Sequence, residues 1–190
     1  MDGPRIVYLH GFCSSPASWK ARLLAEFLAN AGLADRFACP LLSHVPQAAI
    51  ARIEALLCAD DSPTTLVGSS LGGYYAAWLA ENYDLKAVLI NPAVMAPALL
   101  DGLVGTHTNY YSGRRFEFSA EHAEQLRALD TPRVTPSRYL LLAETGDEVL
   151  DYRQAVERYA GSQQTIVEGG DHSFSRFPDF VPQIIEFCGL

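Results

Sequence analysis

A serine, an aspartate and a histidine that each follow an apolar run are the residues most able to do chemistry in this chain. Ser70 lies in the pattern G-x-S-x-G at residues 68–72, after the apolar run 64–67 and before a helix-like stretch. This pattern at a strand-to-helix turn predicts a nucleophilic serine, because the flanking glycines remove the Cβ atoms that would collide in so sharp a turn. The alternative is an ordinary serine in a tight turn.

A possible acid and a possible base follow later in the chain. Asp147 comes shortly after the apolar run 139–143, and His172 follows the strand-like run 165–167. The chain order Ser70, Asp147, His172 is that of the α/β-hydrolases and differs from the orders in chymotrypsin and subtilisin. Because strand ends share one crevice in an open α/β sheet, we expect these side chains to meet. Taken alone, the histidine would be read as an ordinary loop residue.

The identity of the acid has alternatives, because other carboxylates lie near the proposed residues in sequence. Asp147 is preferred, since it follows the strand end by a short turn. Asp171 adjoins the histidine, and neighbouring residues seldom align for a bond to Nδ1, whereas Glu144 would be the partner if the turn were tighter. The four alternatives are Glu144, Glu148, Asp151 and Asp171.

The first strand-like run supplies a candidate site for a developing negative charge. Residues 5–9 lead into His10, Gly11 and Phe12, where the glycine permits a tight turn. The backbone N–H groups of Phe12 and Leu71 are the predicted donors of an oxyanion hole. His10 precedes this turn, and chain order favours a structural role for it over that of the base.

Several longer blocks of sequence resemble a known family, the small bacterial YqiA-like esterases of the α/β-hydrolase superfamily. The resemblance runs from about residue 5 to the C-terminus and implies a carboxylic-ester or thioester hydrolase that forms an acyl-enzyme on Ser70, with Asp147 and His172 completing the triad. One departure is Cys13, where a polar residue such as asparagine is expected. The blocks are Tyr8–Pro16, Gly68–Ala76, Ile90–Ala93, Thr145–Tyr152 and Gly169–Phe174.

Strand-like and helix-like segments alternate along most of the chain, which indicates a parallel sheet covered on both faces. We predict one domain over residues 1–190, a reduced α/β-hydrolase fold with a six-stranded, mostly parallel sheet in the superfamily order 2-1-3-4-5-6. The predicted strands are 5–9, 36–39, 64–68, 86–90, 138–143 and 163–167, and the predicted helices are about 17–31, 46–59, 71–83, 151–160 and 177–188.

The alternation breaks over residues 94–137, a long and poorly periodic stretch. Such an insertion in a compact domain is often functional, and it leaves the carboxyl end of the fourth predicted strand. We expect a small cap that overhangs the crevice and shapes the acyl pocket. The alternative is a surface loop whose only structure is a helix at 120–129. The candidate pocket residues are Tyr75, Tyr110 and Tyr111.

Composition narrows the possible partners. The chain has 190 residues, of which 49% are hydrophobic, and its formal net charge is −8. This acidity argues against binding to nucleic acid or to an anionic membrane surface. The apolar runs are far shorter than the roughly 20 residues of a membrane span. The first residues show no basic or apolar segment of a signal peptide, so export is not expected.

The cysteines lie far apart and form no C-x-x-C pair, so neither a zinc site nor a disulfide framework is predicted. This usage fits a reducing cytoplasm. No Asp, Glu and His cluster has the spacing of metal ligands, and we predict no metal and no cofactor. The oligomeric state is not readable from the sequence. The cysteines are Cys13, Cys39, Cys58 and Cys188.

Fold and triad do not by themselves fix the reaction. A small-molecule ester or thioester is the preferred substrate. A perhydrolase or a carbon–carbon bond hydrolase would keep the same three residues. A binding module that uses the fold without catalysis would be expected to have a broken triad, and no such break is visible in the sequence.

Overall fold

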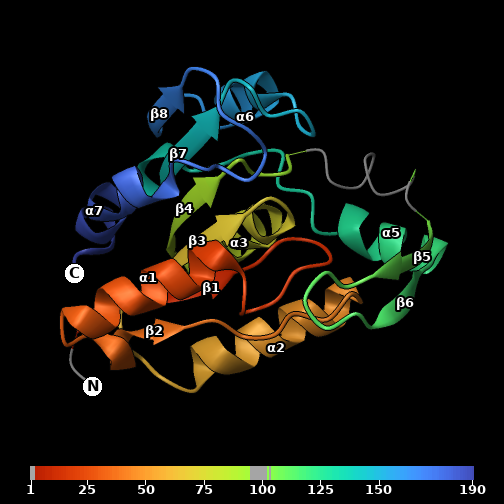
Figure 1. Ribbon diagram of the computed structural model, residues 1–190, viewed down its shortest axis with the longest axis horizontal. Coiled ribbons are helices and arrows are strands. Elements are labelled where there is room, and N and C mark those ends of the chain that lie inside the picture. Colours follow the sequence, from red (N-terminus) through yellow and green to blue (C-terminus); the bar gives the residue numbers. More distant parts are fainter. Residues whose placement is uncertain (1–2, 95–101, 103) are drawn as a thin grey trace.

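The computed structural model describes residues 3–94, 102 and 104–190, and its centre is a six-stranded sheet (Figure 1). Every neighbouring pair of strands in this sheet is parallel, and the order is β2-β1-β3-β4-β7-β8. This is the predicted order 2-1-3-4-5-6, which is thereby confirmed. The strands are β1 (Arg5–Leu9), β2 (Phe37–Ala38), β3 (Thr64–Ser69), β4 (Lys86–Ile90), β7 (Tyr139–Glu144) and β8 (Gln163–Val167).

Helices cover both faces of the sheet, because side chains alternate between the faces along each strand. Val7 and Leu9 belong to the core beneath α2, α3, α5 and α6, whereas Ile6 and Tyr8 belong to the core beneath α1 and α7. Buried on both faces, the central strands are almost continuous apolar runs. The helices are α1 (Trp19–Asn30), α2 (Pro46–Cys58), α3 (Leu71–Tyr83), α5 (Ala120–Arg127), α6 (Tyr152–Arg158) and α7 (Phe177–Cys188).

The predicted insertion contains more regular structure than the single helix of the surface-loop alternative. An antiparallel hairpin of β5 (Gly105–Thr108) and β6 (Arg115–Phe118) precedes α5. Figure 1 shows this hairpin beside α5, away from the large sheet, and Gln125 of α5 accepts a hydrogen bond from the Gln47 N–H at the start of α2. The first part of the predicted insertion, at 95–101 and 103, lies outside the described residues.

The turn between β3 and α3 brings three segments of backbone together. Ser70 has φ 55° and ψ −122°, a left-handed backbone that a non-glycine residue rarely adopts. A Cβ atom at Gly68 would lie 2.3 Å from the Gly72 carbonyl oxygen, and one at Gly72 would lie 1.9 Å from the Leu9 carbonyl oxygen. The two glycines of the motif are therefore required by backbone contact, and one of these contacts is with the neighbouring strand β1.

Gly72→Ala is expected to lower the free energy of unfolding by about 3 kcal/mol or more, because the methyl group must displace the backbone at Leu9. Urea unfolding followed by circular dichroism measures the change. Gly11→Ala is the comparison, since its Cβ would lie 3.4 Å from the Ser69 carbonyl oxygen and needs only a small adjustment. Equal midpoints for Gly72→Ala and the unchanged protein would contradict this close approach.

Candidate active site

Three side chains from separate loops meet at the carboxyl edge of the sheet. His172 Nε2 lies 3.1 Å from Ser70 Oγ, and His172 Nδ1 lies 2.8 Å and 3.0 Å from the two carboxylate oxygens of Asp147. The serine follows β3, the aspartate follows β7 and the histidine follows β8. Because a carboxylate only accepts hydrogen bonds, Nδ1 carries the proton and Nε2 is left to accept one from the serine hydroxyl. The structure thus brings the three predicted residues together.

Hydrogen bonds hold the unusual backbone of Ser70. Its N–H donates to the Ile90 carbonyl at 3.1 Å, and its carbonyl accepts from Gly73 and Ala93 at 2.9 Å and 3.1 Å. A strained backbone persists only where the interactions around it hold it in place. Here the hydrogen bonds link the turn to the end of β4 and to the first turn of α3. The hydroxyl is therefore fixed above the sheet edge.

The environment of Asp147 favours its charged form. The side chain is only 2% exposed, and Oδ1 accepts hydrogen bonds from the backbone N–H groups of Val149 and Leu150 at 2.9 Å and 2.8 Å. Burial acts to raise the pKa of this carboxyl, but hydrogen bonds from His172 and from the backbone outweigh it and hold the pKa below its ordinary value. Asp147 is thus a permanent negative charge beside the imidazole near neutral pH.

Glu144, the strongest alternative acid, is fully buried but bonded elsewhere. Its Oε1 accepts from Arg176 Nε at 3.0 Å, and its Oε2 accepts from the Asp171 backbone N–H at 2.9 Å. A Cβ at Gly170, which has φ 77°, would collide with this carboxylate, so the loop before the histidine wraps closely around it. Glu144 therefore shapes the loop that carries His172.

The remaining alternative acids also have other neighbours. Glu148 accepts a hydrogen bond from the backbone N–H of His172 at 2.9 Å, and Asp151 caps the start of α6 by accepting from the Arg153 N–H at 3.1 Å. Asp171 has a buried Oδ1 without a hydrogen-bond partner among the described residues. Of the five carboxylates considered, Asp147 is the one hydrogen-bonded to the imidazole.

A buried lysine beneath the histidine loop was missed by the sequence reasoning. Lys20 of α1 is 8% exposed, and its Nζ donates to the Ser173 carbonyl at 2.6 Å. Burial lowers the pKa of this ammonium to about 8, although nearby carboxylates act in the opposite direction. The spacing gave a signal, because Lys20 precedes Leu24 and Leu28 at four-residue intervals and so falls on the buried face of the helix.

Asn91 was missed as well, although it lies in one of the blocks that carry the family resemblance. Its Nδ2 donates to the carbonyls of Asp171 and His172 at 2.9 Å and 3.3 Å, and its Oδ1 accepts from the Glu144 N–H at 2.9 Å. A polar residue directly after β4 was the available signal, because that position lies at the same strand edge as the other site residues. Asn91 ties the end of β7 to the histidine loop.

The predicted oxyanion donors lie beside the serine. A Cβ at Gly11 would be 3.8 Å from Ser70 Oγ, so the turn that follows β1 passes close to the hydroxyl. The N–H of Leu71 is the first of α3 and has no acceptor within its own helix. Among the described residues, no group accepts a hydrogen bond from the Phe12 N–H. Both N–H groups are thus available to a ligand.

His10 is neutral and structural in this arrangement. Its Nε2 accepts from the Leu42 N–H at 3.0 Å, so Nδ1 carries the proton and donates to the Gly11 carbonyl, also at 3.0 Å. Burial lowers the pKa of this imidazole, and the bond to Gly11 offsets the effect only in part. The histidine therefore joins the turn after β1 to the segment after β2, as the sequence predicted.

The hairpin of the insertion packs on the candidate oxyanion turn. The Phe12 ring makes edge contacts with the rings of His107, Phe116 and Phe118, at centroid distances of 5.1, 5.7 and 5.5 Å. At the hairpin tip, Asn109 Nδ2 donates to the Ser14 carbonyl at 2.7 Å, and the next residue's N–H donates to the Cys13 carbonyl at 2.9 Å. The shape of this turn thus depends on the insertion.

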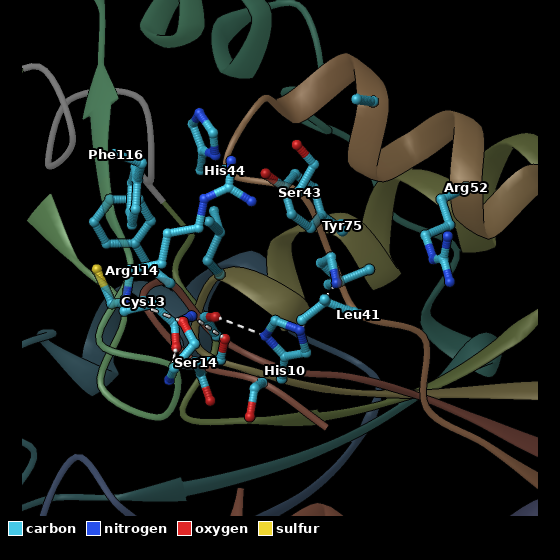
Figure 2. Close-up of a pocket in the computed structure, with 18 residues that line it drawn as sticks. His10, Cys13, Ser14, Leu41, Ser43, His44, Arg52, Tyr75, Arg114 and Phe116 are labelled. Atoms are coloured by element: carbon cyan, nitrogen blue, oxygen red, sulfur yellow. Dashed lines mark hydrogen bonds between the residues drawn. The ribbon is translucent and has the colours of Figure 1, made fainter. Parts of the chain in front are cut away.

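A cavity of about 550 Å³ is lined by Leu71, the residue after the serine, and by the turn that follows β1, whereas Ser70, Asp147 and His172 are not among its lining residues. Figure 2 shows the side chains around this cavity. Its walls come from residues 10–15, from 41–44 and from parts of α2, α3 and the hairpin. Tyr75 lines it and is 2% exposed. Tyr110 and Tyr111, the other two candidate pocket residues, are outside its lining and are 81% and 48% exposed.

Two further properties follow from the described part of the chain. Within it, no group of three or more His, Cys, Asp or Glu side chains has an arrangement that could hold a metal ion. None of the helices over these residues has the length and apolar character needed to cross a membrane.

Comparison with known proteins places the chain in a family and in a fold. The uncharacterised protein family UPF0227 matches residues 5–189. Mouse alpha/beta hydrolase domain-containing protein 10 is 18% identical with a TM-score of 0.75, over 100% of this chain and 92% of that one. The monoacylglycerol lipase of Paleococcus ferrophilus is 18% identical, with a TM-score of 0.69 and coverage of 98% and 96%. Est1E from Butyrivibrio proteoclasticus, solved with ferulic acid, is 16% identical, with a TM-score of 0.71 and coverage of 98% and 88%. These matches confirm the family resemblance and the α/β-hydrolase fold.

Proposed function

Because this chain belongs to the uncharacterised protein family UPF0227, whose name states no activity, its chemistry must be argued from the site, and we propose that it is a serine hydrolase of small carboxylic esters or acyl-thioesters. The observation that carries the proposal is the continuous hydrogen-bonded series from Ser70 through His172 to Asp147 at the strand-to-helix turn. The monoacylglycerol lipase among the proteins of the same fold lends it support.

In the proposed mechanism, Ser70 Oγ attacks the carbonyl carbon while His172 Nε2 takes the hydroxyl proton. The N–H groups of Phe12 and Leu71 stabilise the oxyanion that forms. When the intermediate collapses, His172 returns the proton to the leaving alcohol or thiol, and the acyl group remains on the serine. Water then attacks the acyl carbon while His172 takes one of its protons. His172 returns this proton to Ser70 Oγ as the bond between the acyl carbon and Oγ breaks, which releases the carboxylic acid and restores the serine hydroxyl. Asp147 holds the imidazole and stabilises its charged form.

The test is labelling by a fluorophosphonate probe together with hydrolysis of a short-chain nitrophenyl ester and of the matching acyl-thioester. We expect labelling of one serine, identified as Ser70 by mass analysis of the peptides, and turnover of the esters. If a folded protein is not labelled and hydrolyses neither substrate, the proposal fails and the binding-module alternative takes its place. A comparison of the ester with the thioester gives the preferred leaving group.

We also propose that residues 94–137 form a cap-like insertion within a single domain and that it acts through the oxyanion turn. Asn109→Ala removes the donor to the Ser14 carbonyl, so the turn is expected to shift and kcat for a nitrophenyl ester to fall about tenfold, less than loss of an oxyanion donor itself costs. The urea midpoint should change little.

The control for this prediction is Thr106→Ala on the same hairpin. Thr106 Oγ1 donates to the exposed Glu117 carboxylate, away from the oxyanion turn. Its removal should leave kcat and the rate of fluorophosphonate labelling unchanged. If Asn109→Ala has wild-type kcat, the hairpin does not position the turn.

A further inference from the structure

The cavity beside Ser70 has a charge that the rest of the protein does not share. The chain has 22 acidic residues against 14 lysines and arginines. Nevertheless the cavity lining contains two arginines, Arg52 and Arg114, and two histidines, His10 and His44, with no aspartate or glutamate. A cleft lined by one sign of charge concentrates ligands of the opposite sign.

Neither cavity arginine has an ion-pair partner among the described residues. Seven other arginines of the described chain lie within 4.0 Å of a carboxylate, as Arg5 does with Asp60. The guanidinium groups of Arg52 and Arg114 have no such neighbour. Figure 2 shows Arg114 beside His44 on one side of the cavity and Arg52 on the other, on α2. Their hydrogen-bond donors are available to a ligand.

The charge of Arg114 acts inside the cavity. The His44 ring lines the cavity and stacks on Phe116 at a centroid distance of 4.6 Å. Burial lowers the pKa of this imidazole, and the charges of His122 and Arg114 lower it further. His44 is therefore neutral near pH 7 and offers no competing cation, while Arg114 keeps its charge.

The same cavity adjoins the reacting serine. Ser70 is not itself among the lining residues, but the lining includes Leu71, the next residue in the chain, and the turn residues Gly11 and Phe12, which lie close to the serine. A ligand in the cavity can place a carbonyl group at the serine and still extend toward the hairpin. On that side Arg114 is accompanied by the polar residues Asn109 and Ser112.

We propose that this cavity selects an ester or thioester that carries a second, anionic group, a carboxylate or a phosphate, and that Arg114 binds this group. The inference rests on the proposed function and adds a substrate class to it. A guanidinium binds both kinds of anion through two parallel hydrogen bonds, a geometry that an ammonium group does not match. Arg52 strengthens the positive potential from the opposite wall.

The kinetic test compares nitrophenyl butyrate with its counterparts that carry a terminal carboxylate or a terminal phosphonate, the latter standing for a phosphate. We expect kcat/KM to be about tenfold to a hundredfold higher for one of the anionic esters, and which one identifies the group. In Arg114→Gln this preference should fall to within about threefold of unity, through a loss of kcat/KM for the anionic ester. Arg114→Lys should restore the preference only in part.

The matched control is Arg115→Gln, which removes the same charge from the next residue of the hairpin but lies outside the cavity lining. It should keep the full preference for the anionic ester. Equal kcat/KM for neutral and anionic esters in the unchanged protein overturns the proposal. So does an anion preference that Arg114→Gln retains, or one that Arg115→Gln loses equally.

A binding measurement separates this proposal from the proposed catalysis. Monomethyl glutarate, an anion, and dimethyl glutarate, its neutral diester, are titrated into Ser70→Ala by calorimetry. Preferential binding of the anion, lost in the double variant with Arg114→Gln, supports the proposal even if the unchanged protein hydrolyses no ester. Equal binding of both compounds, or binding of neither, overturns it even if the protein proves to be an esterase.

Discussion

Ser70→Ala is expected to lower kcat for a short nitrophenyl ester by about 10⁴- to 10⁶-fold and to abolish fluorophosphonate labelling. The reason is that His172 Nε2 then has no hydroxyl at 3.1 Å from which to take a proton, and no acyl-enzyme forms. Steady-state rates measured at high enzyme concentration quantify the loss. The urea midpoint should change little, because the backbone bonds that hold the turn remain.

Ser69→Ala is the matched control for this result. It makes the same chemical change one residue earlier, at a buried side chain, whereas the imidazole is hydrogen-bonded to Ser70 and Asp147. We expect kcat within a fewfold of the unchanged protein. If both variants lost activity equally, a general distortion of the turn would explain the result. If Ser70→Ala retained activity, the nucleophile would have to be sought elsewhere.

The second large effect concerns Asp147. Asp147→Asn is expected to lower kcat by about 10⁴-fold, because a carboxamide can donate to His172 Nδ1 and so hold the imidazole in the tautomer that cannot accept the serine proton. Kinetics on the folded variant measure this.

The same substitution also changes acid stability, since the pKa of Asp147 is lower in the folded protein than its ordinary value of 3.8. Its stabilising contribution is complete above that value and is lost as the pH falls through the folded pKa, so Asp147→Asn lacks this part of the acid transition.

Glu144→Gln tests whether Glu144, rather than Asp147, is the acid of the triad. Glu144 bonds to Arg176 and to the Asp171 N–H, so its neutralisation should lower the free energy of unfolding by about 1–3 kcal/mol. Its kcat, measured where the protein is folded, should fall far less than that of Asp147→Asn. A reversed order of the two variants would make Glu144 the acid and would remove Asp147 from the mechanism.

The strand order and the meeting of the three loops were predictable because their signals are local. The glycines around Ser70 exist to avoid contacts that the motif itself implies, and the apolar runs before Asp147 and His172 locate strand ends to within a residue or two. In a parallel sheet those ends lie at one edge, so residues that directly follow the strands were expected to lie close together in space.

The hairpin of the insertion was not predicted, for a physical reason. Its strands are four residues long, and their inward residues, such as His107 and Phe116, pack mainly on Phe12 and His44 from distant parts of the chain. The connecting loop at 109–114 is longer than the two-residue turns that can be read from sequence. The tertiary contacts decide this element, and local propensity does not.

The positive charge of the cavity could not be predicted from the sequence either. Arg52 lies in α2 and Arg114 before β6, and nothing in their separate surroundings joins them. The negative total charge argued against binding of an anion, but a sum over 190 residues does not describe the charge of one concave surface. Only the folding of two remote segments against residues 10–15 creates a basic cavity.

The hairpin has a consequence for how this protein can be re-engineered. One short segment both fastens the turn after β1, through the carbonyls of Cys13 and Ser14, and contributes Arg114 to the cavity wall. Under the two proposals, this one segment therefore affects both turnover and selectivity. Transplanting residues 104–118 from a relative should alter both at once, whereas a library confined to α2 can vary selectivity while the donors beside the serine stay in place.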